Sequence, residues 1–248
     1  MILSNLTWQD VEAVPRSVVV LIPTGSLEQH GPHLPLFTDS ILVSAVAEAV
    51  EARLPEKIIL TPTLWLGASA HHLEFPGTLS GDFTTYMGAI KSVAESLIGH
   101  GFTKFYVVNG HGGNTEPNGV VLRELKEAHK GLTFGHSGYF AFVEEFTKDV
   151  LEGPIKGIRH SCEAEVSLMM HVRPDLVRRE KLRDDGLKPE PPIRGLVHRF
   201  DEITEEGSLG YATLATAEKG KALFDTAVEG LAEELGWLAD GYVLTSPP

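Results

Sequence analysis

The chain has 248 residues, of which 42% are hydrophobic and 22% charged, a composition typical of a globular protein rather than a disordered one. Its 21 lysines and arginines face 34 aspartates and glutamates, so the formal net charge is −13. Such a charge repels phosphate backbones and anionic lipid, and we expect neither a nucleic-acid nor a membrane partner. A single cysteine, Cys162, cannot form an internal disulfide, which favours a reducing, cytoplasmic location. The first residues do not have the pattern of a signal peptide, and the apolar runs are too short to span a bilayer.

Short apolar runs alternate with longer amphipathic stretches along the chain. The runs predict buried strands, and the stretches with apolar residues three or four positions apart predict helices. In chain order the expected elements are a strand at 17–23, a helix at 40–54, a strand at 58–60, a helix at 84–98, a strand at 104–108, a helix ending near 128, one or two strands within 132–143, a short helix at 163–171 and a long helical region at 213–238. Strands that alternate with helices indicate a mainly parallel sheet covered on both faces.

One long stretch, 180–210, is rich in proline, glycine and charge and shows no clear period. Its length favours a functional or interface loop over a linker between domains. The sequence therefore predicts one α/β domain over residues 1–248.

Polar side chains concentrate in the segment that follows the first strand. Glu28, His30 and Asp39 lie within twelve residues, and Glu28 and His30 would project to the same side of an extended loop. In parallel sheets, reactive groups collect beyond the carboxyl ends of the strands. Carboxylate and imidazole ligands suit Zn²⁺, Mn²⁺ or Fe²⁺. The alternatives are a polar surface loop and, for Asp39, an N-cap on the next helix.

A second candidate site follows the strand at 104–108, where the sequence is Asn-Gly-His-Gly-Gly-Asn at 109–114. The glycines allow a tight turn with accessible backbone N–H groups around one imidazole, that of His111. We expect His111 to supply a fourth metal ligand from a neighbouring strand end. A phosphate-binding loop is the competing interpretation, but the Walker lysine is absent. A second alternative is a simple strand-to-helix turn with a solvated histidine.

The third candidate segment runs from Arg159 to Glu165. His160 precedes a short apolar helix, and Glu163 lies one turn into it, so both could face one cavity. Glu165, two residues further, should point elsewhere. Cys162 is expected to be a buried structural thiol rather than a ligand or nucleophile.

A fourth stretch follows the second strand. Its Ser69 and His72 could line a pocket and bond a substrate amide, or they could only fix the loop.

Together these segments resemble the creatininase family, the creatinine amidohydrolases and their relatives. The family's E-x-H-x8-D spacing is met by Glu28, His30 and Asp39, and its N-G-H turn by residues 109–111. Its F-P-G-T segment appears at 75–78 and its A-T-x-E-K-G stretch at 215–220. The resemblance implies a three-layer α/β/α fold, often a hexamer, with a two-metal site that hydrolyses non-peptide C–N amide bonds.

By this resemblance, Glu28 and His111 hold one metal, His30 holds the other, and Asp39 bridges them. The two ions, which we expect to be Zn, Mn or Fe, would lower the pKa of a bridging water toward about 7. His160 is the expected proton donor to the departing nitrogen, because imidazole titrates near neutral pH. Ser69 and Gly112 are the candidate contacts to a small amide substrate.

Two departures from the family pattern change these expectations. Creatininases carry a glutamate two residues after the turn histidine, where this chain has Gly113, so we expect Glu163 to complete the second metal site and Glu165 to be a buried structural acid. The family's aromatic residue four positions before His160 is Lys156 here, which argues against creatinine itself.

The NGHGGN turn is similar instead to formamide- and peptide-cleaving branches, including formamidopyrimidine deformylases and a cofactor-precursor peptidase. The expected activity is therefore hydrolysis of a cyclic amide or formamide. A metal-binding scaffold without activity is the non-enzyme alternative.

Overall fold

A computed structural model of the protein describes residues 1–187, 193 and 195–242. Its sheet consists of β1 (Val19–Thr24), β2 (Ile58–Leu60), β3 (Lys104–Asn109) and β4 (Thr133–Gly138). The strand order is β2-β1-β3-β4, and all neighbouring pairs are parallel. The register pairs Thr24 with Asn109, so the two loops predicted to carry metal ligands leave the sheet side by side.

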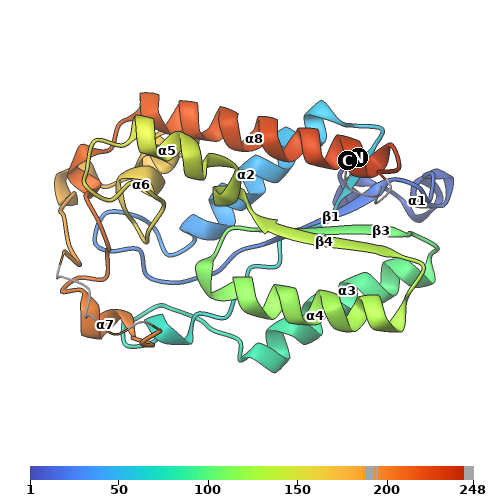
Figure 1. The fold of residues 1–248 in the computed structure, drawn as a ribbon, viewed down its shortest axis with the longest axis horizontal. Helices are drawn as coiled ribbons and strands as arrows, with labels where there is room; N and C mark the ends of the chain where they lie inside the picture. The colour runs from blue at the N-terminus through green and yellow to red at the C-terminus, as the bar shows by residue number, and fades with distance from the viewer. Residues whose placement is uncertain (188–192, 194, 243–248) are drawn as a thin grey trace.

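Helices cover both faces of this sheet (Figure 1). On one face lie α2 (Thr38–Arg53), α6 (Glu163–Val172) and α8 (Ala217–Ala239); on the other lie α3 (Phe83–Gly99) and α4 (Thr115–Ala128). Side chains of β1 alternate between the two cores: Val19 and Leu21 pack with α2 and α8, while Val20 and Ile22 pack with α3 and α4. A strand buried on both faces explains its continuous apolar run. The predicted three-layer α/β/α sandwich is confirmed.

Several elements differ from the sequence-based expectation. The stretch 132–143 holds one of the one or two strands expected there, β4, and its last residues form a 3-10 helix instead, Tyr139–Val143. Two short helices, α1 (Trp8–Ala13) and α5 (Glu144–Val150), were not expected. Asp39 is not the N-cap of α2, because that helix begins at Thr38 and the carboxylate turns toward the candidate site.

The excursion at 180–210 carries a short helix, α7 (Phe200–Ile203), and its residues 188–192 and 194 lie outside the described residues. Both α6 and α7 lie at the end of the molecule toward which the strands point (Figure 1). Among the described residues, no helix has the length and apolar content needed to cross a membrane.

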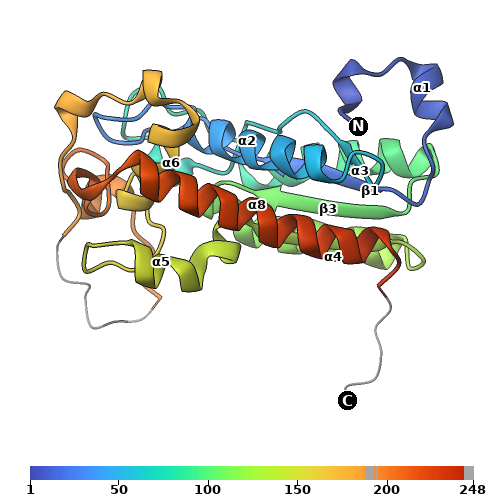
Figure 2. The same ribbon diagram turned by 90° about the horizontal axis from the view of Figure 1, so that it is seen from above.

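The long helix α8 runs along the sheet with α6 against its first turns (Figure 2). A Cβ atom on Gly220 would lie 1.8 Å from the carbonyl oxygen of Ser167 in α6. This glycine therefore allows the two helices to pack closely. The position of α6 matters because it carries the acidic residues near the site.

We predict that Gly220→Ala lowers the free energy of unfolding by about 1–3 kcal/mol, because the new methyl group must push α6 and α8 apart. Gly236→Ala in the same helix is the matched control, since nothing lies within 4 Å of its added Cβ atom. That control should be neutral or stabilise by roughly 0.5–1 kcal/mol. Urea unfolding measures both, and equal midpoints for the two variants would contradict the close packing of α6 and α8.

Candidate active site

The loops after β1 and β3 bring the predicted metal ligands to the same buried edge of the sheet. Glu28 and His30 lie in the first loop, and Asp39 lies in the first turn of α2. His111 begins the turn after β3, whose Gly110 N–H donates to the Thr24 carbonyl. A Cβ atom on Gly110 would lie 2.8 Å from the backbone oxygen of Asp39. The glycine therefore lets the start of α2 lie against the turn that carries His111.

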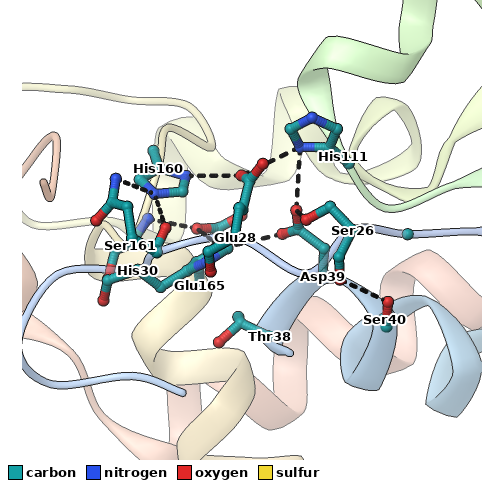
Figure 3. A network of polar contacts seen from close by, with 12 residues as sticks. Ser26, Glu28, His30, Thr38, Asp39, Ser40, His111, His160, Ser161 and Glu165 are labelled. Atoms are coloured by element: carbon teal, nitrogen blue, oxygen red, sulfur yellow. Dashed lines mark hydrogen bonds and ion pairs between the residues drawn. The ribbon is translucent and has the colours of Figure 1, made fainter. Parts of the chain in front are cut away.

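One half of the cluster is formed by His111, Glu28 and Asp39 (Figure 3). The Nδ1 atom of His111 lies 3.1 Å from Glu28 Oε1 and 3.1 Å from Asp39 Oδ2. On the other side of the ring, Nε2 lies 3.3 Å from the backbone oxygen of Ala68. Because a carbonyl only accepts, Nε2 carries a proton, and Nδ1 is the ring nitrogen that faces the two carboxylates. A histidine held in this way by a carbonyl is the usual arrangement of a metal ligand.

The other half repeats this arrangement around His30. Its Nδ1 donates to the backbone oxygen of Glu28 at 3.1 Å. Its Nε2 faces Asp39 Oδ1 at 3.0 Å and Glu165 Oε2 at 3.9 Å. The two oxygens of Asp39 therefore face different histidines, so this carboxylate joins the two halves.

Three carboxylates share this space with little solvent. Glu28, Asp39 and Glu165 are 0%, 2% and 6% exposed, and their ion-pair partners among the described residues are all histidines. Among the residues that the structure describes, neither carboxylate oxygen of Glu28 has a hydrogen-bond partner. A buried carboxylate without a partner is costly, so the donor set fits a bound cation.

The pKa values in the cluster show the same excess of negative charge. Burial would lower the pKa of His30, but the Asp39 carboxylate outweighs it and raises the pKa to about 9. Burial raises the pKa of Glu165 to about 8, against the opposing effect of His30. For His111, the carboxylates of Glu28 and Asp39 outweigh burial and raise the pKa well above its usual value. The carboxylates that favour a proton on both histidines would also attract a divalent cation.

The expected placement of Glu163 and Glu165 is wrong, because the structure reverses it. The Glu163 carboxylate accepts from the backbone N–H groups of Glu152 and Gly153, both at 2.9 Å. It also pairs with the Lys219 ammonium at 2.7 Å. Glu163 therefore anchors the loop before α6 and does not reach the cluster. Glu165, expected to face away, lines the cavity beside His30.

The error comes from the assumption that residue 160 and residue 163 lie on one helical turn. The helix α6 begins only at Glu163, with Cys162 as its N-cap. Ser161 before it has a left-handed backbone, with φ of 52°. This turn redirects the chain between His160 and the helix, so the spacing of three residues carries no information about a shared face.

His160 does lie at the cluster, as expected. Its Nε2 contacts the backbone oxygen of Gln29 at 2.6 Å and so carries the proton. Its Nδ1 lies 3.5 Å from Glu28 Oε1. Burial, followed by the charge of His30, lowers the pKa of His160 well below its usual value. A neutral imidazole thus presents a lone pair to the cavity.

The remaining predicted residues take different places. Gly112 lines the cavity. The Ser69 hydroxyl lies 3.3 Å from His111 Nε2, on the side of that ring away from the carboxylates. Cys162 is buried, and burial raises the pKa of its thiol to about 11, as expected of a structural cysteine. The Lys156 ammonium donates to the backbone oxygen of Leu151, away from the cluster.

A cavity of about 290 Å³ opens onto the cluster. Its wall beyond the cluster includes Phe140, Ile158, Arg159, Phe200 and Leu209. Sequence reasoning missed this wall: Arg159 opens the third candidate segment but was given no role, and the other members come from segments without a catalytic motif. No ion pair of the Arg159 guanidinium is found within the part of the chain that the structure describes.

Sequence reasoning also missed His71, Gln29 and the role of Phe200. The amide nitrogen of Gln29 lies 2.8 Å from His72 Nδ1 and 3.1 Å from His160 Nε2. The Phe200 ring stacks on His72, with ring centroids 4.0 Å apart. The position of Gln29 between Glu28 and His30 was the available signal for this residue. Phe200 had none, because it reaches the cavity from the excursion at 180–210.

Comparisons with known proteins agree with this fold and identify the family. The family model for creatininase, described as creatinine amidohydrolase, matches residues 4–235. The chain is 31% identical to the mycofactocin precursor peptide peptidase of Mycobacterium ulcerans (strain Agy99) over 225 residues, which cover 85% of this chain and 81% of the relative. It is 29% identical to the creatinine amidohydrolase of Pseudomonas putida over 247 residues, which cover 93% and 94% of the two chains.

A solved structure from Bacteroides fragilis NCTC 9343 is also similar, with a TM-score of 0.86, 27% identity, and coverage of 99% of this chain and 98% of that one. Matching creatininase structures include a zinc form and a manganese form. The matched family model covers almost the whole chain, and solved creatininase structures share its fold. The protein belongs to the creatininase family of hydrolases.

Proposed function

We propose that this protein hydrolyses a C–N amide bond at a centre of two divalent metal ions. The observation that carries the proposal is the Asp39 carboxylate, whose oxygens lie 3.0 and 3.1 Å from nitrogens of His30 and His111. Glu28, Asp39 and His111 would hold one ion, and Asp39, His30 and Glu165 the other. Each half then offers three protein ligands, the usual number for catalytic zinc, and leaves a position for water.

When bound, such ions polarise a substrate carbonyl and lower the pKa of bound water. The chain's own residues supply positioning and proton transfer. The Nδ1 lone pair of His160 can accept a proton in the cavity and deliver it to the departing nitrogen, because Gln29 fixes the opposite ring nitrogen as the donor. The backbone of Gly112 is our candidate contact to the substrate, and a contact from Ser69 stays a prediction.

The substrate we propose is a small cyclic amide or formamide, which a cavity of about 290 Å³ can hold. A second candidate is a short peptide, cleaved near its carboxyl end. The observation in its favour is Arg159, a cation on the cavity wall that could pair with a terminal carboxylate. Zinc, manganese and iron all suit the donor set, and a hexamer stays a prediction from the family resemblance.

Turnover of a substrate panel separates these candidates. The metal-loaded protein would be assayed against lactams, cyclic ureides, formamides and short peptides with free or amidated carboxyl ends. Cleavage of ring or formyl amides supports the first candidate. Cleavage of free-acid peptides that is lost in Arg159→Met supports the second. No turnover of any amide by protein that holds two ions would support a metal-binding scaffold and contradict the proposed activity.

Metal content is the first prediction from this proposal. Protein stripped with a chelator and reloaded with zinc should contain about two equivalents per chain. Asp39→Asn should lose more metal than Glu28→Gln, because the Asp39 oxygens serve both halves of the centre. Elemental analysis after gel filtration measures this. A content near zero in the reloaded parent protein would overturn the proposed centre.

The two glutamates of α6 give a matched pair of variants. Glu165→Gln should lower the occupancy of one ion, because it removes a charged ligand from the His30 half. Glu163→Gln should keep both ions but lower the free energy of unfolding by about 1–3 kcal/mol, since the carboxylate accepts two buried backbone N–H groups and pairs with Lys219. Metal loss in Glu163→Gln without loss in Glu165→Gln would contradict the assignment.

The role of His160 is tested by His160→Ala. We expect this variant to keep its metal while kcat falls by roughly 10²–10⁴-fold, the usual contribution of a positioned acid–base group. Metal analysis and steady-state kinetics on the same preparation are needed. Loss of an ion from the variant would show that His160 is a ligand instead.

A further inference from the structure

Two adjacent histidines in the loop between β2 and α3 have different surroundings. The ring of His72 is held on both sides: Nδ1 lies 2.8 Å from the Gln29 amide nitrogen, and Nε2 lies 3.4 Å from Glu28 Oε1. Because the amide nitrogen of Gln29 donates, Nδ1 of His72 is an acceptor and its Nε2–H points at Glu28. The His72 ring is thus oriented by Gln29, with its protonated Nε2 on the side of the Glu28 carboxylate.

His71 is different, because no hydrogen bond or ion pair of its imidazole is found within residues 1–187, 193 and 195–242. The ring is partly buried, lines the cavity, and stacks on His111 with centroids 5.6 Å apart and planes 14° apart. An imidazole in this place with neither nitrogen engaged has a free lone pair beside the cluster.

The space that His71 fills lies next to Gly113. A Cβ atom on Gly113 would lie 2.8 Å from Cε1 of His71 and 2.4 Å from the backbone oxygen of Ala68. The backbone oxygen of Ala68 alone leaves no room for a side chain at position 113. This chain therefore leaves position 113 empty of side chain and places an imidazole from another loop beside it.

We propose that His71 is a ligand of the metal ion held by Glu28 and His111. One ligand atom from each of these three residues lies within 4.8 Å of the other two. Typical Zn–N and Zn–O distances of about 2.0–2.2 Å bring such atoms to within about 4.4 Å of one another, so a small rotation of the side chains suffices. The inference rests on the proposed metal centre; it adds a fourth protein ligand to one of its halves, where a bound water would make the ion five-coordinate.

Two variants separate a ligand from a packing residue. His71→Phe keeps a ring against His111 and Phe200 but cannot bind metal, whereas His71→Glu keeps a ligand in the same place. The control is His129→Phe. His129 follows the last residue of α4, and its imidazole pairs with Glu95 in α3. Zinc affinity would be measured for both ions by competition with a chromogenic chelator, and the Co²⁺-loaded proteins would be compared by visible absorption.

We expect His71→Phe to lower the affinity for one zinc ion by about tenfold or more and to change the Co²⁺ spectrum. Even residues that only hydrogen-bond to metal ligands change metal affinity by about 10–100-fold. His71→Glu should stay within a few-fold of the parent, and His129→Phe should match it. Unchanged affinities and spectrum in His71→Phe would overturn the role of His71 while the proposed centre stands, even if KM rises. A parent protein that binds no zinc would instead overturn the centre itself. Thermal unfolding of the metal-free proteins, prepared with a chelator, shows whether each variant folds.

Discussion

Burying Glu28, Asp39 and Glu165 at one edge of the sheet is the constraint on which the site depends. Each buried carboxylate loses several kcal/mol of solvation, and neither oxygen of Glu28 regains a hydrogen bond from the part of the chain that the structure describes. Within the described residues, lysine and arginine form no ion pair with these three groups. Two divalent cations would provide the missing positive charge, and the histidines around the carboxylates are already oriented to help hold them.

The fold supplies this arrangement by placing loops from distant parts of the chain at one edge. The parallel register of β1 and β3 ends both strands at Thr24 and Asn109, so the loop with Glu28 lies beside the turn with His111. Backbone carbonyls then hold the outer nitrogens of His30 and His111, so their inner nitrogens face the carboxylates. The backbone oxygen of Gln29 orients the His160 ring in the same way. Ring orientation is thus fixed by backbone groups of the protein itself.

The fold was predictable from sequence because its signals are local and repeated. Continuous apolar runs gave three strands at the expected places, and the spacing of 40–54 and 84–98 gave α2 and α3 to within a few residues. The proximity of Glu28 and His30 in space was predictable for the same reason, because they are close together in sequence. The cavity wall beyond the cluster could not be predicted in this way. Phe200 comes from an aperiodic excursion, and no local pattern shows which loop folds back over a cavity.

The reversed placement of Glu163 and Glu165 shows a second limit of prediction from sequence. Positions two apart on a helix face different ways, so sequence indicates that only one of the two meets the cluster. Which one depends on how the chain enters the helix, and this is set by the left-handed Ser161 and by the close packing of Gly220 on Ser167. Such a choice is made by tertiary packing, and one non-glycine residue with positive φ is not visible in composition or periodicity.

The account rests on one carboxylate bridging two ions, and anomalous diffraction at the zinc edge on crystals of the zinc-loaded protein tests it most directly. Two peaks about 3.5–4 Å apart, one on either side of the Asp39 carboxylate, are the predicted result. A single peak beside His111, or zinc bound away from Asp39, would contradict the account.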